Sequence, residues 1–219
     1  MEWVSKKNLF DKTFQTFFYT HYFSILKLGK TSLAKSILGE GFTGDHEATI
    51  FAIYKSEIKL PHKTMPFNVM DCTGSTKYQH KRPAIYPNAN VYVICFEMTN
   101  PKSWMNVQKT FLPEIYDIAN DKPVFLVGTK SDLVSPGKPS VNMFEIDELV
   151  KYYNDKKAKR PFKYVKFFGV SAKNNFQVDK LRDSIVYCAL FCKETFKKNR
   201  KQKKGKEEKK EPKEEKKKK

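Results

Sequence analysis

Near-continuous apolar runs alternate along the middle of the chain with segments whose apolar residues have helical spacing. Such runs are typical of strands buried on both faces of a parallel sheet. The runs that predict strands are residues 17–23, 65–71, 91–96, 123–128 and 164–170. The segments that predict helices are residues 31–38, 104–119, 143–153 and 178–196. This alternation predicts an α/β fold, a mostly parallel sheet with helices on both faces.

Two polar segments follow apolar strands, at the sheet edge where ligands of parallel sheets bind. Gly29-Lys30-Thr31 is a phosphate-binding signature, because glycine lets the backbone approach a phosphate and the ammonium of lysine can lie against it. Thr129-Lys130-Ser131-Asp132 is the second segment. The Asp132 carboxylate can accept two hydrogen bonds from N1–H and the 2-amino group of guanine, a donor pair that adenine lacks. Together the segments predict a guanine-nucleotide site.

The net charge of +18 is concentrated toward the end of the chain, where residues 197–219 hold fourteen Lys or Arg and five Glu. We expect residues 1–16 to be an N-terminal extension, 17–196 a single globular domain and 197–219 a disordered polybasic tail. No apolar stretch is long enough to span a membrane, and the N-terminus has no secretory signal. The four cysteines include no C-x-x-C pair, which favours thiols in a reducing compartment.

Further segments carry a resemblance to a known family. Asp71-Cys72-Thr73-Gly74, Val93-Ile94-Cys95-Phe96, Leu126-Val127-Gly128-Thr129-Lys130 and Ser171-Ala172-Lys173 resemble the motifs of small GTPases of the Ras superfamily, most closely the Rho/Rac family. The resemblance implies the P-loop NTPase fold of a small-GTPase G domain, with a six-stranded, mostly parallel sheet. The 39 positions from Asp132 to Ser171 also predict a helix-bearing insert of Rho type near residues 135–147.

The resemblance implies GTP or GDP bound together with Mg²⁺. Lys30 would lie against the β- and γ-phosphates, and the Gly74 amide would contact the γ-phosphate. Thr31 and Thr49 would ligate Mg²⁺ directly, whereas Asp71 would hold the ion through a water molecule. Thr49 would thereby order its loop only in the triphosphate state.

The resemblance also assigns the contacts to the base. Phe42 would pack against the guanine ring, Lys130 would lie along the base plane, and the Ala172 amide would bind the guanine carbonyl oxygen that Asp132 does not reach. The complete set of residues expected to bind the nucleotide is Leu26, Lys27, Leu28, Gly29, Lys30, Thr31, Ser32, Phe42, Thr49, Asp71, Gly74, Thr129, Lys130, Asp132, Ser171, Ala172 and Lys173.

The chain departs from the family at residues linked to hydrolysis. Ser24 replaces the first glycine of the phosphate loop, and Leu26 replaces a small glycine beside the γ-phosphate. Ser75 replaces the glutamine that orients the attacking water, so the implied catalytic set is Ser75, Lys30 and Thr49. We therefore expect slow or absent GTP hydrolysis. A pseudo-GTPase scaffold without catalysis remains the alternative to a signalling switch.

The expected partners are guanine nucleotide and the effector and regulator proteins of the switch regions. The chain ends in lysines rather than in a prenylation box, so we expect a monomeric, cytoplasmic protein without a prenyl anchor. The sequence leaves two roles open for the tail, a solubilising segment or contact with an anionic surface such as the inner face of the plasma membrane. Nucleic-acid binding is disfavoured, because the tail has no interleaved aromatic residues for base stacking.

Overall fold

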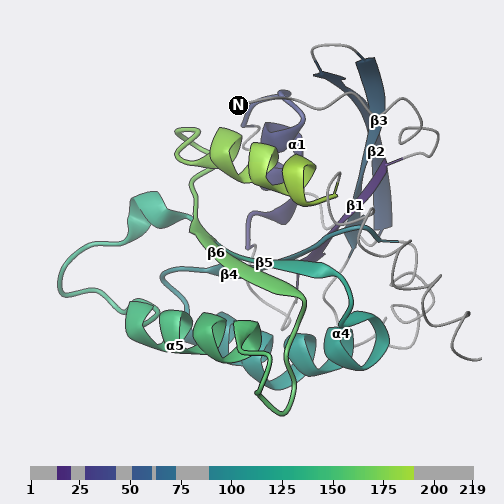
Figure 1. Cartoon of the computed structure of the whole chain (residues 1–219). Coiled ribbons are helices and arrows are strands. Elements are labelled where there is room, and N and C mark those ends of the chain that lie inside the picture. The colour runs from purple at the N-terminus through teal and green to yellow at the C-terminus, as the bar shows by residue number, and fades with distance from the viewer. Residues whose placement is uncertain (1–13, 21–27, 43–50, 61–62, 73–88, 190–219) are drawn as a thin grey trace, which may run out of the picture.

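The computed structural model describes residues 14–20, 28–42, 51–60, 63–72 and 89–189 (Figure 1). Its strands are β1 (Phe14–Thr20), β2 (Phe51–Leu60), β3 (Lys63–Cys72), β4 (Tyr92–Glu97), β5 (Pro123–Thr129) and β6 (Tyr164–Gly169). Its helical elements are α1 (Lys30–Ile37), α3 (Pro101–Asn106), η3 (Val107–Phe111), α4 (Leu112–Ala119), η4 (Ser131–Leu133), α5 (Met143–Asn154) and a helix over residues 178–189.

The six strands form one sheet in the order β2-β3-β1-β4-β5-β6. All neighbouring pairs are parallel except β2 and β3, which are antiparallel. Helix α1 and the helix over residues 178–189 cover one face of the sheet, and α4 and α5 cover the other (Figure 1). The predicted fold class, a six-stranded and mostly parallel sheet between two helical layers, is confirmed.

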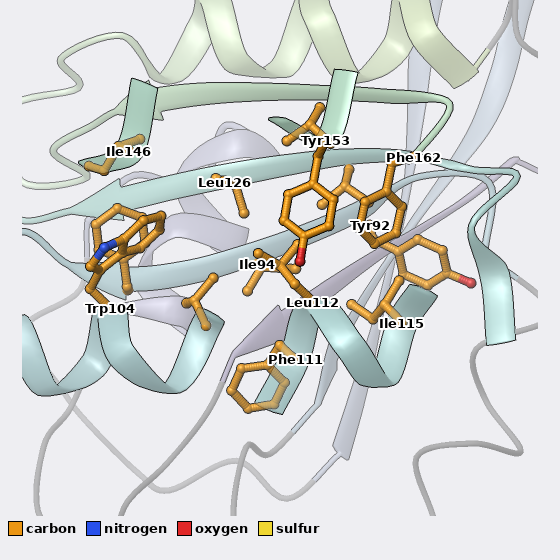
Figure 2. Packing of buried hydrophobic residues seen from close by; sticks show 14 of the residues in the cluster. Tyr92, Ile94, Trp104, Phe111, Leu112, Ile115, Leu126, Ile146, Tyr153 and Phe162 are labelled. Carbon is orange, nitrogen blue, oxygen red and sulfur yellow. The ribbon is translucent and has the colours of Figure 1, made fainter. Parts of the chain in front are cut away.

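Each central strand contributes to two cores because successive side chains point to opposite faces. In β4, Tyr92, Ile94 and Phe96 belong to the cluster under α4 and α5, and Val93 and Cys95 belong to the cluster under α1. Every residue of β4 and β5 is buried. Figure 2 shows how helical residues such as Trp104, Phe111, Leu112 and Ile115 pack onto the first of these clusters. Burial on both faces explains the unbroken apolar runs of the sequence.

The helix predicted over residues 104–119 begins earlier, at Pro101, and runs through α3, η3 and α4. Asn100 caps its start, because the side-chain oxygen accepts hydrogen bonds from the amides of Lys102 and Ser103. Proline suits the first helical position, where an amide proton has no partner within the helix. The turn of π-helix at Val107–Phe111 divides the segment without ending it.

The first strand also begins earlier than predicted, at Phe14 rather than Phe17. Phe14 pairs with Phe67 and Tyr19 with Cys72, so backbone pairing with β3 extends beyond the aromatic run. The predicted boundary between an extension at 1–16 and a domain at 17–196 therefore places strand residues in the extension. Residues 1–13 and the tail at 197–219 lie outside the described part of the chain.

The predicted Rho-type insert helix near residues 135–147 is wrong. Between β5 and β6, every residue is described, and only the short η4 and α5 are helical. Helix α5 buries Ile146 and Tyr153 against the sheet, so it is the covering helix of this layer and not an addition to it. The extra length lies in the irregular segments 134–142 and 155–163.

In the described part of the chain, no helix combines the length and the apolar character needed to cross a bilayer.

Gly128 of β5 lies where the side chains of Met98 and Phe167 leave no room for a β-carbon. A β-carbon added there would lie 2.2 Å from Met98 Sδ and 3.2 Å from Phe167 Cε2. We expect Gly128→Ala to lower the free energy of unfolding by about 1–3 kcal/mol, because a close-packed core accommodates an added methyl only by displacing side chains. Urea unfolding measures this loss.

The double variant Gly128→Ala/Met98→Ala provides the control for that prediction. Truncating Met98 removes the two atoms that would lie nearest to the new methyl, so the two losses should be less than additive. Fully additive losses would contradict the steric cause.

Candidate functional site

A cavity of about 250 Å³ opens at the edge of the sheet where the parallel strands end. Its walls come from the start of α1, from Phe42, from the end of β5 with η4, and from the segment after β6. The lining residues are Gly29, Ser32, Leu33, Phe42, Thr129, Lys130, Asp132, Leu133, Val170, Ser171, Ala172 and Lys173. Parallel sheets bind ligands at this edge, because the connections that follow neighbouring strands meet there.

The loops at the base-binding end are tied together by backbone hydrogen bonds. The Ser131 amide donates to the Val170 carbonyl oxygen at 3.1 Å, and the Val170 amide donates to Gly128 at 2.8 Å. Ser171 forms an isolated bridge with Phe176, which fixes the turn that carries Ala172. Asp132 is exposed at the mouth of the cavity. Its carboxylate is therefore available to a ligand that enters between the two loops.

Phe42 also lines this cavity. Its side chain is 44% exposed, although it is a large aromatic group. An exposed aromatic face at a cavity wall suits stacking on a planar ring. The structure thus brings Phe42 to the same cavity as Lys130, Asp132 and Ala172, which are distant in the sequence.

The buried hydroxyl of Thr129 links the base-binding loop to the phosphate-binding segment. It lies 2.6 Å from the Leu28 carbonyl oxygen and 3.0 Å from the Phe96 carbonyl oxygen, and its single proton is donated to one of the two, the Leu28 oxygen being the nearer. Leu28 directly precedes Gly29 and the start of α1. The hydroxyl therefore fixes the spacing between the two halves of the site.

Gly29 allows the turn from the phosphate-binding segment into α1. It has a φ of 76° and forms the N-cap of the helix, a left-handed conformation that side chains with a β-carbon rarely adopt. Lys30 and Thr31 follow as the first residues of α1. The amides at the start of a helix favour an anion such as phosphate, so the turn suits the predicted ligand.

Lys30, Thr31 and Asp71 meet beneath this turn. The Thr31 hydroxyl donates a hydrogen bond of 2.6 Å to Asp71 Oδ2, which comes from β3 across 40 positions of sequence. Asp71 is fully buried, and Lys30 is 4% exposed. The parallel sheet brings these residues together, because β3 ends next to the strand that leads toward α1.

Burial disfavours the charged forms of both titratable groups. It lowers the pKa of Lys30 against the opposing effect of Asp71. It also raises the pKa of the Asp71 carboxyl, and the Lys30 charge and the Thr31 hydrogen bond offset only part of that rise. A phosphate beside Lys30 and a cation beside Asp71 would each favour the charged form of the group that it adjoins.

The donor set fits Mg²⁺. Asp71 Oδ1 is buried and accepts no hydrogen bond within the described residues, and the Thr31 hydroxyl lies beside the other carboxylate oxygen. Mg²⁺ prefers oxygen ligands and is held by one or two protein groups together with nucleotide phosphates. The described residues contain no cluster of three or more His, Cys, Asp or Glu side chains that would hold a metal without such phosphates.

The raised pKa of Asp71 predicts how nucleotide-free protein responds to pH. Because the folded state holds this proton more tightly than the unfolded state, ionisation destabilises the fold as pH rises from the unfolded pKa through the folded pKa. The neutral variant Asp71→Asn escapes this loss. In EDTA, we expect the free energy of unfolding of Asp71→Asn to rise relative to that of the wild type as pH rises from acid to neutral, on top of whatever constant change the substitution itself introduces. Urea titrations across the pH range measure both quantities, and a constant difference would contradict the argument.

The structure brings together nine of the residues predicted to bind the nucleotide around one cavity, and it places three more directly beneath. The nine are Gly29, Ser32, Phe42, Thr129, Lys130, Asp132, Ser171, Ala172 and Lys173. The three are Lys30, Thr31 and Asp71. The carbonyl oxygen of Leu28, another predicted residue, lies within hydrogen-bond distance of the Thr129 hydroxyl. Leu26, Lys27, Thr49, Gly74 and Ser75 lie outside the described residues, as does Ser24.

Sequence reasoning missed several residues of this site. Leu33, Leu133 and Val170 line the cavity with apolar surface. Glu97 forms a salt bridge with Lys130, with Lys130 Nζ 3.0 Å from Glu97 Oε2. A signal was present, because Glu97 is a charged residue directly after the apolar run at 91–96, at the edge where the site was expected.

Comparisons with known proteins agree with this geometry. The chain matches the model of the Ras family over residues 26–211, which is most of its length. It is also 31% identical over 105 residues to the human protein "Rho-related GTP-binding protein RhoD", an alignment that covers 48% of this chain and 50% of the relative. The chain thus spans about half the length of the curated relative that it matches. The family match over most of the chain shows that the chain belongs to the Ras family of small GTPases.

Proposed function

We propose that the chain binds GTP and GDP with Mg²⁺ and acts as a Rho-like signalling switch that hydrolyses GTP slowly. One observation carries the proposal: the guanine-reading residues Asp132, Lys130 and Ala172 line a single cavity with Phe42, and this cavity adjoins the Thr31–Asp71 pair. A cavity for a planar base next to a paired hydroxyl and carboxylate, with the buried Lys30 beside them, suits a purine nucleotide with its metal.

The base would be held by groups at the cavity wall. The Asp132 carboxylate accepts from N1–H and the 2-amino group, and the Ala172 amide donates to the carbonyl oxygen of guanine. Phe42 and the stem of Lys130 enclose the ring and exclude water. Because adenine offers the opposite pattern of donors and acceptors, binding it would leave buried groups unpaired.

The phosphates would be held at the start of α1. The buried Lys30 ammonium and the first amides of the helix bind the phosphate oxygens. Thr31 and Asp71 would hold Mg²⁺, and when bound this ion neutralises charge that develops on the phosphate oxygens during transfer. These residues position and neutralise the triphosphate, and they supply no nucleophile of their own.

Slow hydrolysis is proposed from Leu26 and Ser75. A glutamine orients the attacking water in this family, and serine is too short to reach the same point. The Leu26 side chain would occupy space beside the γ-phosphate that a glycine leaves open. The chain would then remain bound to GTP, and effector proteins would stay bound to it for longer.

Nucleotide content tests the proposal. Denatured, purified protein should release guanine nucleotide, and protein reloaded with GTP and Mg²⁺ should show little hydrolysis in a single-turnover assay. The variant Leu26→Gly/Ser75→Gln should hydrolyse GTP faster by about tenfold or more, while Lys102→Gln provides a control outside the site. Absence of bound guanine nucleotide in the presence of Mg²⁺ would favour the pseudo-GTPase scaffold. Rapid GTP hydrolysis by the wild type would contradict the proposed slow hydrolysis but not the proposed nucleotide binding.

We also propose that the polybasic segment 197–219 contacts anionic lipid. The loop 155–163 carries the exposed residues Lys156, Lys157 and Lys159 and leads into the start of β6, at the edge of the sheet opposite the nucleotide cavity. Lysines on that edge would add to the attraction of the tail, at about 1 kcal/mol per basic residue near the surface. Contact there would leave the nucleotide cavity facing away from the lipid.

Vesicle sedimentation with the full chain tests this contact. Vesicles that contain phosphatidylserine should retain the protein at low salt and release it at high salt, and pure phosphatidylcholine should not bind it. Replacing Lys156, Lys157 and Lys159 with Gln should weaken retention more than replacing Lys55, Lys59 and Lys102, which are equally exposed but lie elsewhere. Equal retention on both kinds of vesicle would contradict the contact, and the tail would then serve solubility.

A further inference from the structure

Glu97 is an acidic residue beside the cavity that, under the proposed function, binds the nucleotide. Glu97 ends β4, pairs in register with Thr129 of β5 and is buried. It does not line the cavity, whereas Lys130, the next residue after Thr129, does. Its Oε2 atom lies 3.0 Å from Lys130 Nζ.

The surroundings of Glu97 fix its position. Its amide donates to Ser103 Oγ at 3.0 Å, and its carbonyl oxygen accepts from the Asn100 amide at 2.9 Å. On the side chain, the Thr99 hydroxyl donates to Oε1 at 3.0 Å. Strand β4 and the capped start of α3 thus hold both the backbone and the carboxylate of Glu97.

The other carboxylate oxygen depends on Lys130. Glu97 Oε2 is buried and accepts no directed hydrogen bond within the described residues, so the ammonium 3.0 Å away is the charge that compensates it. Among the ion pairs of the described residues, Glu97 pairs with Lys130, and a buried carboxylate constrains its cation strongly because leaving either charge unpaired is costly.

Lys130 itself occupies an unusual backbone conformation. Its φ is 55°, in the left-handed region, which few residues other than glycine adopt. Its side chain is 32% exposed and forms part of the cavity wall. A long, flexible side chain on a turn of this kind would adopt several rotamers without a fixed partner at its tip.

We propose that Glu97 is a positioning residue that holds Lys130 against the bound guanine nucleotide. The carboxylate fixes the ammonium behind the cavity, and the stem of Lys130 is then laid along the wall before the base arrives. Pre-organisation of this kind lowers the entropy lost on binding and slows release of the ligand. The residue acts through Lys130 and does not touch the nucleotide.

Release of a fluorescent GDP analogue in Mg²⁺ tests the proposal with the full chain. Glu97→Gln should accelerate release by about fivefold to tenfold, because it removes the charge that holds Lys130 while keeping the shape of the side chain. Glu97→Asp keeps the charge and should recover part of the loss. Glu145→Gln, an equal change of charge at an exposed position of α5, should leave release unchanged.

A double-mutant cycle distinguishes positioning from a general effect on the fold. In the background of Lys130→Gln, the further change Glu97→Gln should alter release by less than about twofold. Independent, additive effects would overturn the proposal, and so would slower release from Glu97→Gln, which would mean that Glu97 repels the nucleotide. Thermal unfolding without nucleotide identifies any variant that fails to fold.

Nucleotide binding by the wild type separates failure of the proposed function from failure of the role of Glu97. A wild-type chain that binds no guanine nucleotide would overturn the proposed function and the role of Glu97 with it. A wild-type chain that binds nucleotide, with release unchanged in Glu97→Gln, would overturn the role of Glu97 alone.

Discussion

Asp132→Asn is expected to lower the affinity for GDP by about a hundredfold or more and to create affinity for xanthosine diphosphate. The Asp132 carboxylate faces the cavity and would accept two charge-assisted hydrogen bonds from guanine, each worth about 1.5–3 kcal/mol. Asparagine keeps one acceptor but turns an amide donor toward the 2-amino group of guanine. Xanthine has a carbonyl oxygen at that position, so it matches the new donor. Competition between the two nucleotides measures the change.

The control for this prediction is Asp147→Asn, which removes the same charge from an exposed position of α5. It should leave both affinities unchanged. If Asp132→Asn weakened GDP and xanthosine diphosphate equally, the loss would reflect damage to the loop. The assignment of Asp132 to the base would then be wrong.

Lys30→Met is the second change with a large expected effect, a loss of about a hundredfold in affinity for GTP. Methionine keeps a stem of similar length and removes the ammonium that would bind the phosphates. The site is dry, since Lys30 is 4% exposed and Asp71 is fully buried, and charge interactions are strong where water is excluded. Titration calorimetry with GTP measures the loss.

Measuring the affinity of Lys30→Met for guanosine separates loss of phosphate binding from damage to the fold, because guanosine carries the base without the phosphates. Its affinity should stay unchanged, so the ratio of GTP affinity to guanosine affinity should fall. Lys35→Ala, on the same helix, should preserve that ratio. An equal fall for guanosine would indicate that loss of Lys30 disrupts the fold around Asp71, because a buried carboxylate is then left without its cation.

The local pattern of apolar residues was sufficient to predict the central strands. It also predicted that the two nucleotide-binding motifs follow strands. Strands β4 and β5 are buried on both faces, so their apolar runs could be recognised without knowledge of their neighbours. Strand β2 was missed, although Lys55, Glu57 and Lys59 alternate with half-buried residues along it. It pairs only with β3 at the edge of the sheet, so it alternates between exposed and half-buried positions and lacks a continuous apolar run.

The number of residues between Asp132 and Ser171 could not show whether α5 is an insert or a helix that covers the sheet. That number suggested an insert with its own helix, but spacing does not say which helix covers the sheet. Packing decides that question: Ile146 and Tyr153 of α5 are buried in the cluster beneath the sheet. The additional residues lie in the segments on either side of α5.

The sequence by itself was enough to predict the type of ligand, because Lys30 and Asp132 belong to short motifs that follow apolar strands. The residues that line the cavity around them come from four separate segments, and only the parallel sheet brings those segments to one edge. The salt bridge between Glu97 and Lys130 belongs to this second kind of information. The salt bridge depends on the register that places Glu97 beside Thr129. That register is set by hydrogen bonds between β4 and β5. It cannot be read from the residues of either strand alone.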